Sequence, residues 1–389
     1  MNLIKHTTNR SYIESQLYIL CIVAILFSGC KKQVYSDYNG QSVADFNQVF
    51  EGFWNNVNTN YVYWDIDTTN WDNKYYQFKP LFAKLDLNNP NDVNKSIGYF
   101  KQMTSSLIDS HFQIIGDAPL FAGVNIYPAA DRKRISASFH YQYDYSKTDL
   151  KYFDQTQIGV DTPLHVTLAL IKKKIVYFSC TQFSLLNSYQ SSNSNSVHIV
   201  LDSLFKRVYS DTSKTTGLII DIRNNFGGNL SDLNFFIGHL INKQLDFGYS
   251  RYKSNSNRLD YTPWIKASIT PFGGAKPVAY PIVVLVDNYT VSVAEAVAMA
   301  MHLLPNCKIV GETTWGATGP VAAEDIFNGG QFNLPNIFTV YTSSSEFKYI
   351  DGKMYEGMGF PPDISVPFNL QTLSRGVDSQ LEMAISLIK

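Results

Sequence analysis

Charged residues and cysteine are scarce in this sequence. Only 17% of its 389 residues are charged, and 32 Lys and Arg offset 33 Asp and Glu to a formal net charge of −1. Nucleic-acid binding usually needs a clustered basic face, so this balance argues against a nucleic-acid partner. Four cysteines are too few for a disulfide scaffold. No apolar run reaches the ~18 residues of a membrane-spanning helix.

Apolar residues, in contrast, make up 45% of the chain, enough for a large packed core. Aromatic residues reach 14%, and they predict an aromatic core, with sugar-stacking surfaces as the alternative. At ~100–200 residues per domain, the length predicts two domains, or one large domain with an extension.

The amino terminus has the pattern of a secretory signal, with a basic start and a short apolar stretch over 17–27. The following Leu26-Phe27-Ser28-Gly29-Cys30 resembles a bacterial lipobox, in which the cysteine is lipidated, although Phe27 departs from the usual small or aliphatic residue. An ordinary signal with an incidental Cys30 is the alternative. We predict a lipoprotein signal peptide over 1–29 and a polar tether over 30–41.

A lipid on Cys30 would anchor the protein to a bacterial cell envelope, on the periplasmic side or the outer surface of the outer membrane. The lipid would then be its only attachment to the membrane. Cys180 and Cys307 remain in the mature chain, and they could pair or stay as buried thiols.

Two parts follow the tether. Apolar residues recur at helical spacing from residue 42 to about 113, which predicts a helical N-terminal domain, including a helix capped by Asn91 or Asp92. The remainder, 114–389, is predicted to be an α/β core with a β-rich first part, in which 134–143 alternates as a strand would.

The second part repeats a strand, a turn and a helix. Buried-strand patterns lie at 217–221, 281–286 and 308–311, with helices after the first two, near 233–240 and over 293–304. This order predicts an α/β fold with a mixed, largely parallel sheet and flanking helices. Ligands of such sheets bind at the carboxyl ends of the strands.

Two of these turns carry candidate chemistry. The first, after 217–221, contains Gly227 and Gly228, and it could be a phosphate loop, an oxyanion donor or only a tight turn; its spacing fits neither the dinucleotide fingerprint nor the P-loop. The second places Ser292 at the start of a helix, where free N–H groups favour an anion. Ser292 could be a nucleophile or a simple N-cap.

A nucleophilic serine needs a base, and His111 is the best candidate. It follows Leu107-Ile-Asp-Ser110 at the end of a predicted helix, where a side chain can enter a cleft, although a lone histidine is more often structural. The other histidines lie in the signal, in strand patterns, inside helices or at a helix start.

Four motifs occur in a known order: the glycine turn, the Ser292 helix start, Gly311-Glu-Thr-Thr-Trp-Gly316 and Glu356-Gly-Met-Gly-Phe-Pro-Pro-Asp363. Together they resemble the peptidase family that contains the carboxyl-terminal processing (tail-specific) proteases, the tricorn core peptidase and the interphotoreceptor retinoid-binding protein. The resemblance is best over about 215–365. It implies a crotonase-like or ClpP-like peptidase core, here with a helical N-terminal cap.

The resemblance also separates two catalytic styles. Processing proteases carry a lysine base where this chain has Ala317, so a Ser–Lys dyad is absent. The tricorn-like style uses a histidine preceded by serine and a glutamate before Pro-Asp, which Ser110-His111 and Glu356 match. The resemblance thus implies Ser292 as nucleophile, His111 as base, and Ser110 and Glu356 as orienting groups.

The N–H groups of Gly228 and Val293 would form the oxyanion hole, with Gly227 as a weaker candidate. Arg223, Asp221 and Asp363 are interpreted as structural residues at strand ends, and Glu295 as an acidic residue in the first turn of its helix, outside the site.

Residues 114–190 lack the carboxylate-binding loop of a PDZ domain, so the domain that captures substrate tails in many relatives is not recognisable. The leading hypothesis is a cell-envelope serine peptidase acting on peptides or proteins, with no cofactor and no metal. The alternatives are a catalytically inactive ligand- or peptide-binding protein on the same fold and, more remotely, a glycan-acting protein, for which no carboxylate pair argues. The sequence leaves the oligomeric state unknown.

Overall fold

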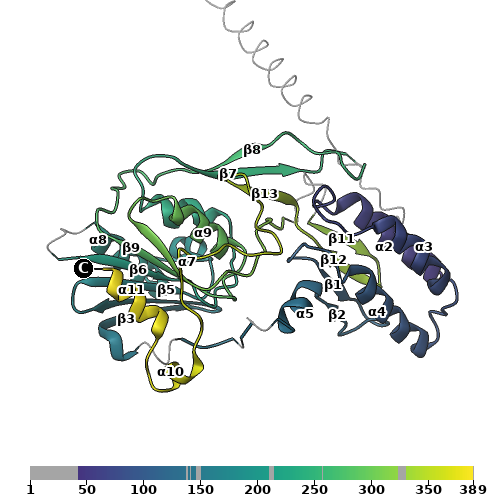
Figure 1. Cartoon of the computed structure of the whole chain (residues 1–389), viewed down its shortest axis with the longest axis horizontal. Coiled ribbons are helices and arrows are strands. Elements are labelled where there is room, and N and C mark those ends of the chain that lie inside the picture. The colour runs from purple at the N-terminus through teal and green to yellow at the C-terminus, as the bar shows by residue number, and fades with distance from the viewer. Residues whose placement is uncertain are drawn as a thin grey trace, which may run out of the picture.

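The computed structural model describes residues 43–136, 139–140, 142–145, 150–209, 214–255, 257–322 and 330–388. Cys30 and the predicted signal and tether lie outside the described residues. Figure 1 shows two groups of elements side by side, one around a large sheet and the other around helices α2, α3 and α4, with strands β7, β8 and β13 above them.

A seven-stranded sheet forms the centre of the larger group, in the order β14-β10-β9-β6-β5-β4-β3. The strands from β5 to β14 run parallel, and β3 and β4 pair antiparallel at one edge. The fold class predicted from the sequence, a mixed and largely parallel sheet, is therefore confirmed. The strands are β3 (Phe153–Asp161), β4 (Leu164–Ile171), β5 (Ile175–Cys180), β6 (Gly217–Asp221), β9 (Ile282–Val286), β10 (Cys307–Gly311) and β14 (Ile364–Ser365).

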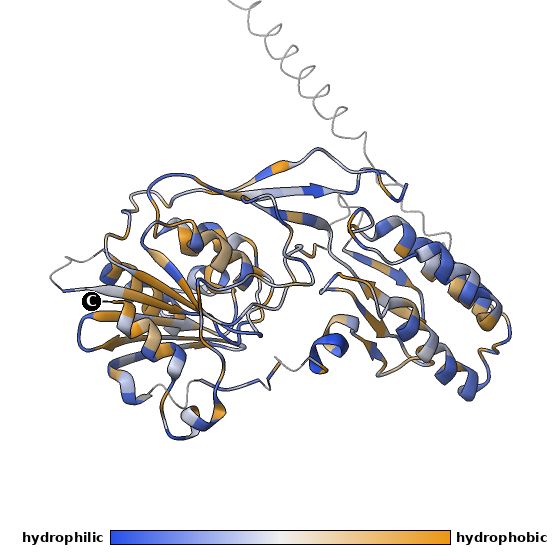
Figure 2. Ribbon diagram, in the orientation of Figure 1, coloured by the Kyte–Doolittle hydropathy of each residue, from blue (hydrophilic) through white to orange (hydrophobic). Residues whose placement is uncertain are grey.

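Both faces of this sheet are covered, which explains why β6 and β9 are buried along their whole length. Alternate residues of β6 point to opposite faces: Leu218 and Ile220 pack with α8 (Ser196–Val208) and α9 (Val293–His302), whereas Ile219 packs with α11 (Ser379–Leu387). Figure 2 shows the resulting apolar interior as a band of orange strands.

The smaller group packs α2 (Phe46–Asn60), α3 (Trp71–Phe82) and α4 (Pro90–Thr104) against a four-stranded antiparallel sheet. Its centre is aromatic, with the Phe53, Phe100 and Phe338 rings in edge-to-face contact at centroid distances of 4.9–5.6 Å. The strands come from distant parts of the chain: β1 (Gln113–Gly116), β2 (Asn125–Ile126), β11 (Gln331–Leu334) and β12 (Phe338–Tyr341). Hydrophobic packing thus joins 113–126 and 331–341 to the N-terminal helices.

A three-stranded sheet in the order β13-β7-β8 connects the two groups. Arg251 at the end of β7 forms an ion pair with Asp65, and Arg258 beyond it pairs with Asp72 of α3. The strands are β7 (Leu245–Tyr252), β8 (Ile265–Ile269) and β13 (Ser345–Tyr349). The remaining helical segments are α5 (Pro128–Arg134), α7 (Leu185–Ser191) and α10 (Leu370–Ser374), with single turns at η1 (Leu150–Tyr152) and η2 (Leu233–Ile237).

Two local predictions were wrong. The strand expected over 134–143 is absent from its described residues: Arg134 ends the helix that Pro128 begins, and the residues described beyond it are in no strand. Helix α4 begins at Pro90. Its N-cap is Asn89, which precedes the predicted caps Asn91 and Asp92 by two and three residues. In the described part of the chain, no helix is long and apolar enough to cross a membrane. Cys180 and Cys307 are both buried free thiols.

Candidate active site

Three loops leave the carboxyl ends of the neighbouring strands β6, β9 and β10 and contact one another there. The N–H of Asn224, after β6, donates to Asp287 Oδ1 after β9 at 2.9 Å. The N–H of Trp315, after β10, donates to the Thr290 carbonyl at 2.9 Å. The strand order therefore brings together the glycine turn, the Ser292 turn and the 312–319 turn, as the sequence predicted.

The first loop requires both of its glycines. Gly227 and Gly228 have φ angles of +87° and +146°, which L side chains rarely adopt. A Cβ on Gly227 would lie 2.6 Å from the Ser292 Cβ, and a Cβ on Gly228 would lie 2.0 Å from the Phe183 carbonyl oxygen. The close approach of the backbone to Ser292 is thus a reason for the glycine pair.

The N–H groups at this turn differ in whether they already have a hydrogen-bond acceptor. The Gly227 N–H donates to Asn225 Oδ1 at 2.9 Å, so it is not available to an oxyanion. The N–H groups of Gly228 and Val293 donate to no acceptor among the described residues, and both residues line the cavity that contains Ser292. They are the two donors that the sequence analysis favoured.

Ser292 has a strained backbone, with φ +60° and ψ −120°. An N-cap residue ordinarily has β-region angles, so helix capping alone does not require this conformation. A serine on a sharp strand-to-helix turn presents its hydroxyl outward, and strain of this kind concentrates at functional sites. The backbone geometry therefore favours a nucleophile over a simple cap.

Glu295 stabilises the turn that carries Ser292. Its buried carboxylate accepts hydrogen bonds from the N–H groups of Ser292 (3.1 Å), Gly316 (2.6 Å) and Ala317 (2.7 Å). Burial raises the pKa of Glu295, and the hydrogen bonds that it accepts oppose this rise. The sequence analysis placed Glu295 outside the site; its position three residues after Ser292, as in a capping box, was the signal for its role.

His111 lies in the N-terminal group, between α4 and β1. Asp109, which is fully buried, holds this segment: it accepts the N–H of His111 (2.9 Å), the N–H of Ser343 (2.7 Å) and the hydroxyl of Thr342 (2.6 Å). The 342–343 turn precedes β13, so Asp109 fixes the position of His111 relative to the connecting sheet. Asp109 was not among the predicted site residues.

Glu356 joins the His111 segment to the 312–319 turn. Its carboxylate accepts the N–H of Ser110 (2.7 Å) through one oxygen and the N–H groups of Thr318 (2.7 Å) and Gly319 (2.9 Å) through the other. Burial, together with the nearby charge of Asp109, raises the pKa of Glu356 to about 8. Ser110 thus meets Glu356 through its backbone, and its buried hydroxyl has no partner.

His111 and Ser292 line the same cavity, which has a volume of about 460 Å³. Burial lowers the pKa of His111, against the opposing effects of Asp109 and the Gly319 carbonyl, so the imidazole is neutral at pH 7. Its Nδ1 is buried and has no hydrogen-bond partner among the described residues. Within the described residues no hydrogen bond joins His111 to Ser292; catalytic hydrogen bonds of this kind often tighten only in the complex with substrate.

Ala317 occupies the position of the lysine base of the processing proteases. Ala317 is fully buried, and its N–H is bonded to Glu295. Among the described residues that line the cavity, the one lysine is Lys266, whose ammonium donates to Asp246 at 2.9 Å. The geometry therefore offers His111, and no lysine, as the base.

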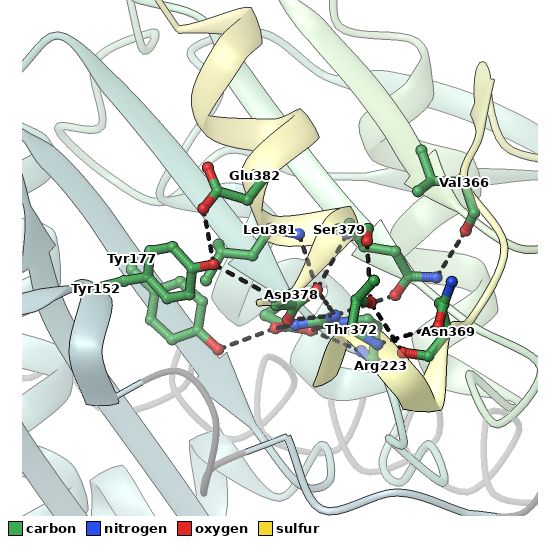
Figure 3. Close-up of polar contacts among 12 residues, drawn as sticks. Tyr152, Tyr177, Arg223, Val366, Asn369, Thr372, Asp378, Ser379, Leu381 and Glu382 are labelled. Carbon is green, nitrogen blue, oxygen red and sulfur yellow. Dashed lines mark hydrogen bonds and ion pairs between the residues drawn. The ribbon is translucent and has the colours of Figure 1, made fainter. Parts of the chain in front are cut away.

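The polar residues next to this edge have a structural role. Figure 3 shows Arg223 between the end of β6 and the start of α11, where it pairs with Asp221 (2.5 Å) and Asp378 (2.8 Å). Tyr145 covers the guanidinium at 3.8 Å. Asp363 accepts the N–H of Ile309 in β10 at 2.8 Å. These contacts agree with the structural interpretation of Arg223, Asp221 and Asp363.

No group of three His, Cys, Asp or Glu side chains in the described part of the chain could hold a metal ion. The structure thus brings Ser292, His111, Gly228 and Val293 to one cavity and places Glu356 and Ser110 behind His111. Asp109 and Glu295, which were not predicted as site residues, hold the backbone at His111 and at Ser292, respectively. Nucleophile, neutral base and free N–H donors are the components of acyl transfer.

Comparison with known proteins gives a consistent result. Residues 174–366 match the family model of peptidase family S41. The carboxy-terminal processing protease CtpA of Bacillus subtilis is 26% identical over 179 residues, and the tricorn protease of Thermoplasma volcanium is 24% identical over 185. These matches cover 46% and 47% of this chain, but only 33% and 16% of the two relatives.

Solved structures resemble a larger part of the chain. A crystal structure from Parabacteroides merdae has a TM-score of 0.68 at 20% identity and covers 89% of this chain and 97% of its own. Mature CPAF in complex with lactacystin has a TM-score of 0.62 at 12% identity, over 88% and 98% of the two chains. At these identities the likeness concerns the fold.

Proposed function

We propose that the chain is a serine peptidase, in line with the match of residues 174–366 to peptidase family S41, and that it hydrolyses peptide bonds through an acyl-enzyme on Ser292. The observation that carries this proposal is the strained turn that presents Ser292 at the start of α9, in one cavity with the neutral imidazole of His111. The substrates are peptides or proteins.

The reaction follows from the geometry. His111 takes the proton of the Ser292 hydroxyl as its oxygen attacks the substrate carbonyl, and the N–H groups of Gly228 and Val293 stabilise the oxyanion. The C–N bond then breaks, and His111 gives its proton to the leaving amine. Water, deprotonated by His111 in turn, attacks the acyl-enzyme and releases the acid and Ser292.

We assign the site to the tricorn-like style, in which Ser110 and Glu356 orient the histidine. Two observations support the assignment: Glu356 is bonded to the backbone of Ser110 next to His111, and Ala317 occupies the lysine position. An imidazolium forms on His111 during both half-reactions; the carboxylate of Asp109 favours that charge, and Glu356 does so when it is ionised.

Substitution of the nucleophile tests the proposal. Ser292→Ala should lower kcat for peptide hydrolysis on the order of 10⁶-fold, as loss of the serine does in other serine peptidases. A fluorophosphonate probe should label wild-type protein at Ser292, as peptide mass mapping would show, and should not label Ser292→Ala. Ser374→Ala, which removes an exposed hydroxyl on α10, is the matched control and should behave as wild type.

Activity and labelling that both survive in Ser292→Ala would contradict the proposal. A wild-type protein that neither hydrolyses peptides nor reacts with the probe would instead support the catalytically inactive binding protein considered in the sequence analysis.

We further propose that Cys30 carries a lipid and holds the protein at a bacterial cell envelope. The support is the Leu26–Cys30 pattern alone. Metabolic labelling with an alkyne fatty acid should mark the wild-type protein and not Cys30→Ser. Equal labelling of both proteins would contradict lipidation at this residue.

A further inference from the structure

The cavity extends well beyond the catalytic groups, and its inner wall is apolar. Side chains from five elements form this wall: Leu233 of η2, Phe247 of β7, Ile269 of β8, Ala296 of α9 and Phe347 of β13. Phe247, Phe347 and Leu233 are each 5–6% exposed, and the two phenylalanine rings lie 5.2 Å apart. At about 460 Å³ the cavity has room for a large side chain together with the adjoining backbone.

The charges around the cavity are few. Of the described residues that line it, none is acidic, and the basic side chains are His111 and Lys266. The ammonium of Lys266 is already bonded to Asp246 Oδ2 at 2.9 Å. Among these residues a basic or acidic substrate side chain would find no free counter-charge, and burial of an unpaired charge is strongly unfavourable.

Three exposed apolar side chains also line the cavity, beside the exposed polar residues Asn234 and Lys266. Leu230, Ile265 and Val321 lie along it with 49%, 56% and 40% of their surface exposed. Exposed aliphatic side chains gathered at one cavity are unusual on a protein surface and mark sites that bind apolar groups.

The direction of the reaction assigns the cavity to one side of the substrate. His111 must protonate the leaving amine, so the leaving segment lies along His111 and the Thr318–Pro320 turn. Ala296 lies one helical turn beyond Ser292 on α9, on the apolar wall. The wall formed by Ala296, Phe247 and Phe347 is therefore left for the acyl segment.

We propose, on the basis of the proposed peptidase activity, that this cavity selects a large apolar side chain, such as that of Phe or Leu, on the acyl side of the cleaved bond. The residues that determine this specificity are Ala296, Phe247 and Phe347. The substrates are thus peptides or proteins cleaved after large apolar residues.

The test uses succinyl-Ala-Ala-X-aminomethylcoumarin peptides with the full chain, because in these substrates X occupies the acyl side alone. We expect kcat/KM for X = Phe or Leu to exceed that for X = Lys or Glu by about 10²-fold or more, and that for X = Ala by about 10-fold or more. Equal or higher values for Lys, Glu or Ala would overturn the proposal.

Two substitutions of Ala296 sharpen the test. Ala296→Asp introduces a carboxylate into the wall and should invert the order, so that X = Lys exceeds X = Leu. Ala296→Phe fills the cavity and should shift the optimum to X = Ala. If one variant fails to fold, the other still decides. Ala122→Asp, at an exposed turn of the N-terminal group, is the matched control and should keep the wild-type order. An unchanged order in both folded Ala296 variants would overturn the proposal.

Fluorophosphonate labelling separates the two proposals. If Ser292 is labelled and peptides are cleaved without an apolar preference, the specificity proposal is wrong and the proposed function stands. If the wild-type protein neither reacts at Ser292 nor cleaves any of the peptides, both are wrong.

Discussion

Carboxylates are buried in two regions near the carboxyl ends of the central strands. An ion pair holds them in one region, and neutral hydrogen-bond donors hold them in the other. In the Arg223 cluster, a guanidinium lies between Asp221 and Asp378 and bonds both. In the anionic cluster, Asp109, Glu295 and Glu356 are held by N–H and hydroxyl donors, and none of the described lysines or arginines forms an ion pair with them.

This difference distinguishes a cluster that stabilises the fold from a cluster whose charge can act on catalysis. An ion pair largely cancels its own field, so the Arg223 cluster joins β6 to α11 and leaves little charge for other groups. Donors of the neutral backbone keep a carboxylate in place without cancelling its charge. The anionic cluster therefore leaves the charge of Asp109 available to favour the positive charge that forms on His111 in each catalytic cycle, and Glu356 adds to it when it ionises near pH 8.

The largest expected effect concerns the Arg223 cluster. Arg223→Met removes the guanidinium that pairs with the buried carboxylates of Asp221 and Asp378, and the free energy of unfolding should fall by about 3–5 kcal/mol. Urea denaturation monitored by fluorescence measures this change. Arg134→Met, which removes an exposed arginine 4.0 Å from Asp131, is the control and should change the free energy by less than about 1 kcal/mol.

Because the Arg223 cluster is separate from the cavity, the folded fraction of Arg223→Met should keep the wild-type reactivity of Ser292 toward fluorophosphonate. A loss of reactivity at full folding would show that the two regions are not separate in function, and the comparison would fail.

The sequence predicted one of these regions better than the other. Arg223 and Asp221 follow a buried strand directly, so their structural role could be inferred from local pattern. The strand ends, the glycine pair and Ser292 were predictable for the same reason, since strand–turn–helix order places successive turns at one sheet edge.

The contacts that complete the site are long-range, and no local pattern contains them. Glu356 bonds Ser110 across 246 residues, and Asp109 bonds Ser343 across 234. The small sheet likewise combines strands from 113–126 and 331–341, whose pairing depends on tertiary packing. The alternation over 134–143 is a local pattern that tertiary structure overrides: Arg134 lies in the helix that Pro128 begins, and the residues described beyond it pair with no strand.

The next effect concerns the anionic cluster and its contact with Ser292. Glu295→Gln replaces a carboxylate oxygen with an NH₂ group that faces N–H donors, so the turn at Ser292 should shift. A displacement of this kind should lower kcat by about 10–100-fold with a smaller change in KM. Steady-state kinetics measures both, and the rate of fluorophosphonate labelling should fall in parallel.

Glu51→Gln, on α2 far from the cavity, is the matched control and should retain wild-type kinetics. If Glu295→Gln lost stability as Arg223→Met does, while its folded fraction reacted at the wild-type rate, Glu295 would belong with the structural cluster.

The smallest effect is a change in pH dependence, and it tests the charge of the anionic cluster directly. Burial lowers the pKa of His111 below its usual 6.5, and the base must be neutral, so kcat/KM should rise with pH with a first midpoint below pH 6.5. The pKa of Glu356 is about 8. Ionisation of Glu356 adds negative charge that favours the imidazolium, so a second and smaller rise, less than about 10-fold, should centre near pH 8.

Glu356→Gln removes this titration, and because its NH₂ group would face backbone N–H donors, as in Glu295→Gln, the whole profile should also fall somewhat. Its profile should keep the first rise and lose the second, with a lower plateau above pH 8. A merely structural Glu356 would lower the whole profile and leave its shape unchanged. Because Arg223 already neutralises its carboxylates, Asp378→Asn should leave the profile of the folded protein as in wild type, so one pH titration of the two variants separates charge that acts on catalysis from charge that only holds the fold.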